Sequence, residues 1–317
     1  GKPDAVIGSS VHPFAWESAY RIAKRCKIPF ICEIRDFWPL SFIEIYGWSK
    51  YHPVCLMFSA LERRAYRRAD AIVMTMEFGY QYLKQFPYVK KDHVFWIPNG
   101  YHTERIDQIL ESGSVHLPEE MEHYLTENWC AVYTGSFVDS ERPLDMIDAA
   151  AYLKKMGQDQ IHFAFIGDGH LREKMEEKVR KEKLDHVKIF GRIEPDQVAV
   201  VLSKAGACIA ALKDDRVLND LGLSLNKLND YLYSGTPTVF ACNSVNVVGE
   251  SGGGIVTPCG DPKAFAEALL QIYRMPDEER RAMGERGRRE IREKYNYSLL
   301  AGQYLEILNT CMGRKGR

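Results

Sequence analysis

The segment from Gly222 to Pro237 carries the residue types and the spacing that best suit chemistry. Its pattern predicts a short helix over residues 225–233, because Ser224 is a good N-cap residue and Gly235 fits the position that follows a helix C-terminus. A glycine-containing loop that leads into a helix presents free backbone N–H groups at the positive end of the helix dipole. We therefore expect this helix N-terminus to bind an anion such as a phosphate.

Lys227 and Asp230 add two charged side chains to the same helix. A cation in the first turn is unfavourable for the helix dipole unless an anion lies beside it. The two residues are three positions apart and share a helix face, so together they could hold a phosphate and a hydroxyl-bearing group. The alternative is that Lys227 is solvated and that Asp230 only pairs with it.

Short apolar runs and longer amphipathic runs alternate along the rest of the chain. Strands spaced by helices in this way favour parallel sheets with helices on both faces. In such sheets, ligands bind in the crevice at the carboxyl ends of the strands. The predicted strands are 4–8, 30–34, 71–74, 94–97, 130–134, 162–166, 187–190, 207–212 and 238–241, and the predicted helices include 15–26, 56–69, 144–156, 262–273, 277–295 and 299–311.

A polar, weakly patterned stretch at 103–128 separates two such series of elements. We therefore expect two doubly wound α/β domains in series, the first at 1–105 and the second at 106–298. A C-terminal helix at 299–317 is expected to pack back toward the first domain. The first series offers about four strands, whereas a complete doubly wound domain has about five or six, so we expect that the first domain lacks its opening portion.

The composition excludes several classes of protein. The 42 Lys and Arg against 43 Asp and Glu give a formal net charge of −1, which lacks the bulk positive charge of a non-specific nucleic-acid binder. The 45% hydrophobic and 27% charged fractions exclude wholesale disorder. No apolar run is long enough to span a membrane, and we expect no secretory signal at residues 1–4. The eight cysteines form no Cys-x-x-Cys pair, so we expect buried free thiols in a reducing, cytoplasmic compartment.

The run from Asn226 to Val239 closely resembles the nucleotide-sugar signature of the retaining glycosyltransferase family 4, whose members have the GT-B fold. In that family a helix carries two glutamates seven residues apart, followed by a small-x-Gly-x-Pro-x-Val run. The segment from Pro29 to Pro39 is similar to the acceptor-side segment of members that build bacterial surface polysaccharides. The resemblance implies two Rossmann-like parallel-sheet domains that face a cleft. Further landmarks of the family follow in the expected order at Arg68–Val73, Ile97–Gly100, Phe165–Gly169 and Phe190–Arg192.

Two positions depart from the family signature. Asp230 stands where the second glutamate is expected, and the resemblance implies that this carboxylate hydrogen-bonds the ribose of the nucleotide. Gly222 stands in place of the first glutamate, so the usual carboxylate contact to the donor sugar is absent, and backbone N–H groups of residues 222–225 are expected to contact phosphate or sugar instead. Of the basic pair that the family carries after the first strand of its second domain, Arg142 remains, either as a phosphate partner or as a surface arginine. The implied donor-binding residues are Gly135, Arg142, Arg192, Gly222, Ser224, Leu225, Asn226 and Asp230.

Lys227, Asp36 and His12 are the expected catalytic residues. Lys227 at a helix N-terminus would stabilise the departing diphosphate electrostatically. Asp36 closes a predicted strand and is expected to contact the acceptor or to act as a helper carboxylate, unless it only caps a helix or pairs with Arg35. His12 follows the first strand and either faces the cleft or is a turn residue. The sequence contains no Asp-x-Asp and no His-x-x-x-His spacing, so we expect no metal ion and no cofactor, and a UDP-sugar as the donor.

Arg63, Arg64, Arg67 and Arg68 repeat at helical spacing after an aromatic-rich segment at 37–48. Basic residues beside exposed aromatic residues suit an anionic membrane surface or a lipid diphosphate acceptor. The alternative is a solvated helix face above buried aromatic side chains.

The sequence therefore predicts a glycosyltransferase that moves a sugar from a nucleotide-diphosphate sugar to a glycan or lipid-linked acceptor, with retention of the anomeric configuration. We expect it to serve the synthesis of cell-surface polysaccharide, such as lipopolysaccharide or capsule, in the cytoplasm or peripherally at the inner membrane face. Two alternatives stay open, a nucleotide-sugar epimerase of GT-B fold and a non-catalytic nucleotide-sugar-binding protein. Transfer needs an acceptor, epimerisation needs none, and a binding protein performs neither reaction.

Overall fold

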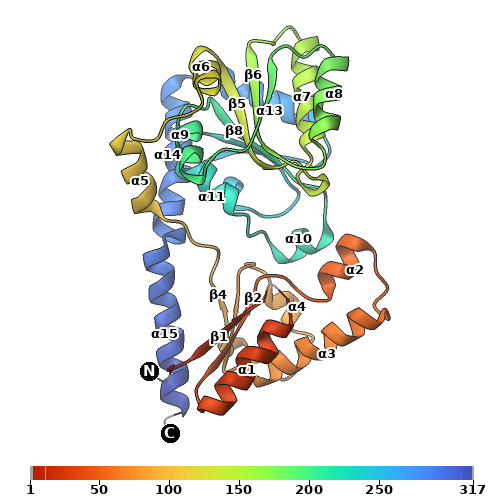
Figure 1. Cartoon of the computed structure of the whole chain (residues 1–317), viewed down its shortest axis with the longest axis vertical. Helices are drawn as coiled ribbons and strands as arrows, with labels where there is room; N and C mark the ends of the chain where they lie inside the picture. Colours follow the sequence, from red (N-terminus) through yellow and green to blue (C-terminus); the bar gives the residue numbers. More distant parts are fainter. Residues whose placement is uncertain (1–2, 11, 316–317) are drawn as a thin grey trace. The chain divides into compact units, whose positions relative to one another are not determined.

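The computed structural model describes residues 3–10 and 12–315 and divides the chain into two compact units (Figure 1). Unit 1 comprises Gly1–Gly100, Asp215–Ser224 and Tyr297–Arg317, and unit 2 comprises Tyr101–Asp214 and Leu225–Asn296. Each unit is a parallel sheet covered by helices, as the alternation of apolar and amphipathic runs predicts.

The sheet of unit 1 has the strand order β1-β2-β3-β4, and all neighbouring strands are parallel. One face holds a core that includes Trp16, Phe30 and Tyr66, and the other face is covered by α15 through Leu300 and Ile307 (Figure 1). The strands are β1 (Val6–Ser9), β2 (Phe30–Ile34), β3 (Ala71–Met74) and β4 (Val94–Trp96), and the helices are α1 (Phe14–Cys26), α2 (Leu40–Tyr46), α3 (Pro53–Arg68), α4 (Tyr80–Leu83), α10 (Arg216–Leu221) and α15 (Tyr297–Lys315).

The sheet of unit 2 has the order β10-β9-β8-β5-β6-β7, again with parallel neighbours. The order reverses between β5 and β8, which is the point where such a sheet opens a crevice for ligands at its carboxyl edge. The strands are β5 (Trp129–Ser136), β6 (Ile161–Asp168), β7 (Val187–Phe190), β8 (Ala207–Ala211), β9 (Thr238–Ala241) and β10 (Gly254–Thr257). The α-helices are α5 (Thr103–Ser112), α6 (Glu119–Glu127), α7 (Pro143–Lys155), α8 (Arg172–Lys181), α9 (Pro195–Ser203), α11 (Asn226–Tyr233), α12 (Val247–Ser251), α13 (Pro262–Arg274) and α14 (Asp277–Glu290).

The structure differs from the sequence predictions at β10, at 103–128 and at 215–224, and it adds the helices α2, α4, α8, α9 and α12. The sequence does not predict strand β10 because the strand begins within a run of three glycines at 252–254, which weakens the strand pattern. The stretch at 103–128 is not irregular but forms α5 and α6. The segment 215–224 groups with unit 1 rather than with the second series of strands, because Val217 and Leu221 pack into the apolar core of unit 1.

Candidate functional site

The candidate site lies at the carboxyl edge of the unit 2 sheet, where β5 ends and α11 begins. Gly135 is the next-to-last residue of β5 and has a φ of +147°, a conformation that L side chains rarely adopt. A Cβ atom at this position would lie 2.6 Å from the Nζ atom of Lys227. Glycine therefore leaves the space in which the ammonium group of Lys227 rests against the end of the strand.

Lys227 is enclosed rather than solvated. Its Nζ lies 2.5 Å from Oε2 of Glu141, donates to the hydroxyl of Tyr133 at 3.2 Å, and stands 4.5 Å from the centre of the Tyr133 ring. The side chains of Lys227 and Glu141 are only 14% and 15% exposed. Burial lowers the pKa of Lys227 below its usual value, and the carboxylate of Glu141 opposes that shift. The alternative of a solvated lysine paired with Asp230 is thus wrong, since the partner is Glu141.

Asp230 is the second charged group of α11. Tyr101 hydrogen-bonds its carboxylate, and burial raises the pKa of Asp230 to about 6, against the opposing effects of the Tyr101 hydrogen bond and the Lys227 charge. Such a group is charged at neutral pH and becomes neutral in mild acid. The sequence predictions missed Tyr101, Tyr133 and Glu141, which contact the two charged residues of α11.

The N-terminus of α11 carries no side-chain cap, so its first backbone N–H groups are open to an anion. The prediction that Ser224 caps this helix is wrong, because the N-cap residue is Leu225 and the Ser224 hydroxyl is buried without a hydrogen-bond partner. The backbone of Ser224 is instead held within unit 1, where its carbonyl accepts from Nδ2 of Asn99 at 3.2 Å. Asn226, the first residue of the helix, is exposed.

Gly222 also belongs to unit 1, as part of the segment 215–224. The backbone N–H of Phe78 donates to the carbonyl of Leu221 at 3.0 Å, which fixes the start of this loop. Gly222 has a φ of +91°, so the position needs glycine for its backbone conformation. Gly222 and Ser224 are therefore positioned by unit 1, whereas Leu225, Asn226, Lys227 and Asp230 are positioned by unit 2.

The two arginines predicted to bind the donor both lie in unit 2 and both have carboxylate partners. Arg142 has a φ of +47° and forms two hydrogen bonds of 2.8 Å with Asp145. Arg192 is 78% exposed at its side chain and lies 3.6 Å from Asp168, the last residue of β6. Both side chains lie at the carboxyl edge of the unit 2 sheet, and the positive charge of each has a carboxylate partner.

His12 and Asp36 belong to unit 1 and follow β1 and β2, two neighbouring parallel strands. His12 is exposed, and its ring centre lies 6.0 Å from that of Phe14. Asp36 keeps an exposed surface, yet partial burial raises its pKa, an effect that Arg35 opposes. The two residues lie at the carboxyl edge of their own sheet.

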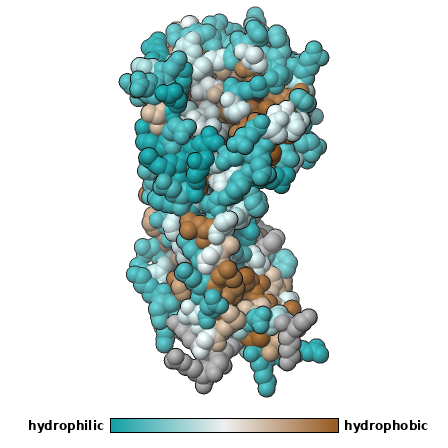
Figure 2. Space-filling model, turned by 90° about the vertical axis from the view of Figure 1, so that its left-hand side faces the viewer, coloured by the Kyte–Doolittle hydropathy of each residue, from teal (hydrophilic) through white to brown (hydrophobic). Residues whose placement is uncertain are grey.

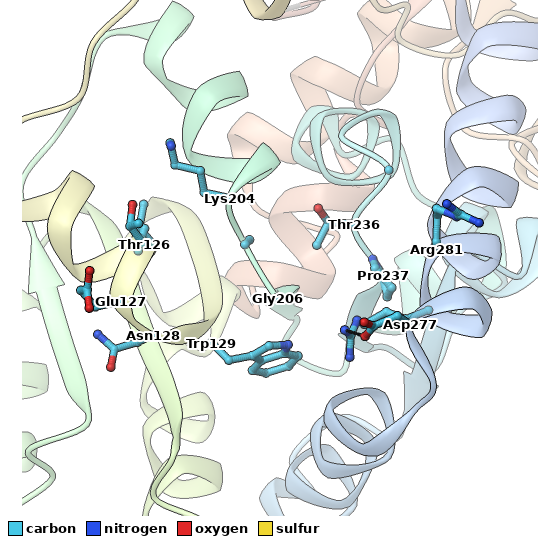
Figure 3. A pocket seen from close by; sticks show the side chains of 14 residues that line it. Thr126, Glu127, Asn128, Trp129, Lys204, Gly206, Thr236, Pro237, Asp277 and Arg281 are labelled. Atoms are coloured by element: carbon cyan, nitrogen blue, oxygen red, sulfur yellow. Dashed lines mark hydrogen bonds and ion pairs between the residues drawn. The ribbon is translucent and has the colours of Figure 1, made fainter.

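A hollow of about 540 Å³ lies at the opposite edge of the unit 2 sheet from Lys227, where β5, β8 and β9 begin. Figure 3 shows its lining side chains, among them Trp129, Lys204, Thr236 and Arg281. Lys204 is paired with Glu122 at 2.7 Å, and the hydroxyl of Thr236 donates to the backbone, so the hollow gathers no reactive constellation. Among residues 3–10 and 12–315, no three His, Cys, Asp or Glu side chains are placed to hold a metal ion.

The sequence of the chain is similar to those of known glycosyltransferases. A family model described as glycosyl transferases group 1 matches residues 119–290, and one described as a glycosyl transferase 4-like domain matches residues 1–100. An uncharacterized glycosyltransferase of Methanocaldococcus jannaschii is 20% identical over 234 residues. That alignment covers 72% of this chain and 62% of the relative, so the chain spans less than two thirds of the relative's length.

Solved structures resemble the chain over nearly its whole length. Anabaena HepE in complex with UDP and glucose has a TM-score of 0.72 at 11% identity, covering 97% of this chain and 78% of that one. Sucrose-phosphate synthase from Thermosynechococcus elongatus has a TM-score of 0.70 at 18% identity, covering 96% of this chain and 73% of that one. With the two parallel-sheet units, these likenesses confirm the predicted GT-B fold.

Proposed function

We propose, from the premise that the chain belongs to the family of group 1 glycosyl transferases, that it moves a sugar from a nucleotide-diphosphate sugar to an acceptor with retention of configuration. The observation that carries the proposal is the enclosed ammonium group of Lys227 at the uncapped N-terminus of α11, with Asp230 one turn further along. A lysine and a helix N-terminus together suit a diphosphate, and a carboxylate beside them suits ribose hydroxyls.

The donor is proposed to be a UDP-sugar bound to unit 2. Support comes from HepE, which was solved in complexes with UDP and with UDP-glucose and shares the fold. Asp230 would accept a hydrogen bond from the ribose, and Lys227 would face the diphosphate. Arg142 and Arg192 are proposed to assist at the phosphates, with the backbone of Gly135, Leu225 and Asn226.

The chemical step breaks the bond between the anomeric carbon and the diphosphate oxygen and joins that carbon to the acceptor oxygen, whose proton leaves with the nucleoside diphosphate. Negative charge therefore grows on the diphosphate as the bond breaks. Lys227 and the positive end of the α11 dipole would stabilise that charge more strongly in the transition state than in the bound donor. We propose that these groups suffice without a metal ion. Asp36 and His12, at the carboxyl edge of the unit 1 sheet, are proposed as contacts to the acceptor hydroxyl.

The acceptor is proposed to be a lipid-linked glycan of cell-surface polysaccharide synthesis. Unit 1 contains a hollow of about 500 Å³ whose lining includes Leu40, Ile43, Phe86 and Tyr88, with Arg63 at its side. Ser59, Glu62 and Gln85 also line this hollow, and its apolar part beside Arg63 suits a hydrocarbon tail that carries a phosphate.

Peripheral contact of unit 1 with the cytoplasmic face of a membrane is part of this proposal. Among the described residues, all of the large apolar side chains that stand exposed belong to unit 1 except Met156 and Val245. Figure 2, which views the molecule from the side of α15, shows apolar surface over unit 1 on that side, and the visible face of unit 2 is mostly hydrophilic. Leu56 and Met57 are exposed near the start of α3, and Arg63 is exposed further along it. An apolar face with basic neighbours suits an anionic lipid surface.

The basic face of α3 consists of Arg63, Arg64, Arg67 and Arg68, and two of these arginines contact other side chains of unit 1. Of its four arginines, Arg68 is paired with Glu17 at 3.1 Å, and Arg67 lies over the ring of Tyr88. No helix of the described residues combines the length and the apolar character needed to cross a bilayer. Vesicle flotation with and without anionic lipid tests the membrane contact, and equal recovery from both vesicle types contradicts it.

The function itself is tested by incubating the chain with a panel of UDP-sugars, in EDTA, with and without a bacterial lipid-linked glycan extract. The proposal predicts acceptor-dependent release of UDP and a new glycosidic bond, with the anomeric configuration retained in the nuclear magnetic resonance spectrum of the product. Interconversion of the sugar without an acceptor would identify an epimerase. UDP-sugar binding without either reaction would identify a binding protein.

A further inference from the structure

The pairing of Lys227 with Glu141 carries a consequence for donor binding. An ammonium group has three N–H donors, and two of those of Lys227 are directed at Oε2 of Glu141 and the hydroxyl of Tyr133. Both charged side chains are largely withdrawn from water. The carboxylate of Glu141 therefore occupies one of the positions beside Lys227 that a phosphate oxygen could take.

The other candidate phosphate-binding cations are neutralised in the same way. The two arginines expected at the phosphates each have a carboxylate partner, as Lys227 has. At the Lys227–Glu141 pair, whose side chains are largely withdrawn from water, a diphosphate that entered without displacing the carboxylate would meet like charge at close range, which is strongly unfavourable. The pairs are Lys227 with Glu141 at 2.5 Å, Arg142 with Asp145 at 2.8 Å, and Arg192 with Asp168 at 3.6 Å.

We propose that Glu141 holds the place of a phosphate on Lys227 and is exchanged for the donor diphosphate when the donor binds. This inference rests on the proposed function. Glu141 ends a three-residue 3-10 turn at 139–141 and is followed by Arg142 in the left-handed conformation. Rotation of the Glu141 side chain would remove its carboxylate from Lys227 and from Tyr133, and would leave Lys227 hydrogen-bonded to the Tyr133 hydroxyl with its remaining N–H groups open to a phosphate.

The exchange explains how one lysine could serve both binding and release. While the diphosphate is bound, Lys227 meets the growing charge of the leaving group. After transfer, return of Glu141 to Lys227 competes with the nucleoside diphosphate product and favours its departure, a step that limits the turnover of many enzymes. A residue with only a structural role would hold Lys227 in place, and its removal would weaken nucleotide binding instead.

The test is calorimetric titration of UDP into the wild-type chain, Glu141→Gln and Glu122→Gln. Glu141→Gln keeps the shape of the side chain and removes its charge, so UDP should bind about threefold to tenfold more tightly. Glu122→Gln removes the same charge from another paired carboxylate of unit 2, at the other edge of the sheet, and should leave the affinity unchanged. Glu141→Asp retains the charge and should stay closer to wild type.

Kinetic measurements distinguish the exchange of Glu141 for the diphosphate from a purely structural role of Glu141. In a transfer assay, Glu141→Gln should lower the inhibition constant of UDP by a similar factor and should lower kcat, because the product leaves more slowly. Equal or weaker UDP binding by Glu141→Gln, with normal binding by wild type, overturns the inference and leaves the proposed function intact. Failure of the wild type and of every variant to bind UDP, ADP or GDP contradicts the proposed donor site and the inference with it.

Discussion

The hydroxyl of Tyr101 is hydrogen-bonded to the carboxylate of Asp230, and this contact ties the first residue of unit 2 to the helix that carries Lys227. Burial raises the pKa of Asp230 to about 6, so the carboxylate is poised to change its charge just below neutral pH. A ribose hydroxyl donates more strongly to the charged carboxylate than to the neutral acid.

UDP affinity should therefore fall as the pH decreases from about 7.5 to 5, with part of the loss centred near the pKa of about 6 of Asp230. The phosphate of UDP titrates in the same range, so Asp230→Asn is the matched control that isolates the contribution of the protein. The variant should bind about tenfold more weakly at pH 7.5, since hydrogen bonds to charged groups contribute about 1.5–3 kcal/mol. The difference between the two proteins should shrink toward pH 5. A constant difference across the range removes Asp230 from the ribose site.

Tyr101→Phe should move that pH dependence upward. The hydrogen bond from Tyr101 stabilises the charged form of Asp230, so its loss raises the pKa of the carboxyl group further. UDP binding by the variant should then begin to weaken at a higher pH than in wild type, with little change at pH 8. Calorimetric titrations at several pH values measure this, and a shift toward lower pH would contradict the assignment.

Much of this site could be predicted from the sequence, because Lys227 and Asp230 lie on one short helix whose limits follow from local pattern. Glu141 could not, since the ion pair joins residues 86 positions apart and depends on how β5 and α11 are placed in the fold. Ser224 shows the opposite failure. Serine is a residue type that often caps helices, so the local pattern favours Ser224 as the N-cap. Val217 and Leu221 instead pack into the core of unit 1 and hold the preceding segment there, and Leu225 takes the N-cap position.

Gly135→Ala should disable donor binding out of proportion to its effect on folding. The added methyl group would lie 2.6 Å from Nζ of Lys227 and would displace that side chain, while the backbone strain at a φ of +147° costs about 1–3 kcal/mol. Gly157→Ala is the control, because Gly157 also has a positive φ, of +68°, but nothing lies within 4 Å of its Cβ position. Thermal unfolding should show comparable losses for both variants, with UDP binding lost only in Gly135→Ala. Normal UDP affinity in Gly135→Ala would argue against the phosphate role of Lys227.

Lys227→Met should lower kcat more than it lowers donor affinity. When the donor binds, Lys227 exchanges the carboxylate of Glu141 for the diphosphate, so it gains little over the free enzyme. In the transition state it also stabilises the additional negative charge of the leaving diphosphate. Removal of a group that stabilises developing negative charge costs about 100-fold or more in kcat. Steady-state kinetics with a UDP-sugar and acceptor measures the effect. A change in kcat of less than about twofold would show that Lys227 takes no part in the chemical step.

The buried carboxyl group of Glu62 should make the free energy of unfolding depend on pH, independently of the candidate donor site. This carboxyl group of unit 1 is 2% exposed and accepts hydrogen bonds from Tyr66 at 3.0 Å and Tyr82 at 3.2 Å. Burial raises its pKa to about 8, so the folded chain binds the proton that the unfolded chain releases near its ordinary value of 4.5. The free energy of unfolding should therefore fall as the pH rises through this window, by up to about 1.4 kcal/mol per pH unit. Chemical denaturation between pH 5 and 8 should show a flatter profile for Glu62→Gln, and identical profiles would mean that Glu62 is charged in the folded protein.

A crystal structure of the chain with UDP tests the central claim most directly. The account predicts the diphosphate within hydrogen-bond distance of Nζ of Lys227 and the N-terminus of α11, the ribose on the carboxylate of Asp230, and the side chain of Glu141 turned away from Lys227. A nucleotide bound elsewhere, such as in the hollow at the other edge of the unit 2 sheet beside Trp129 and Arg281, would contradict it.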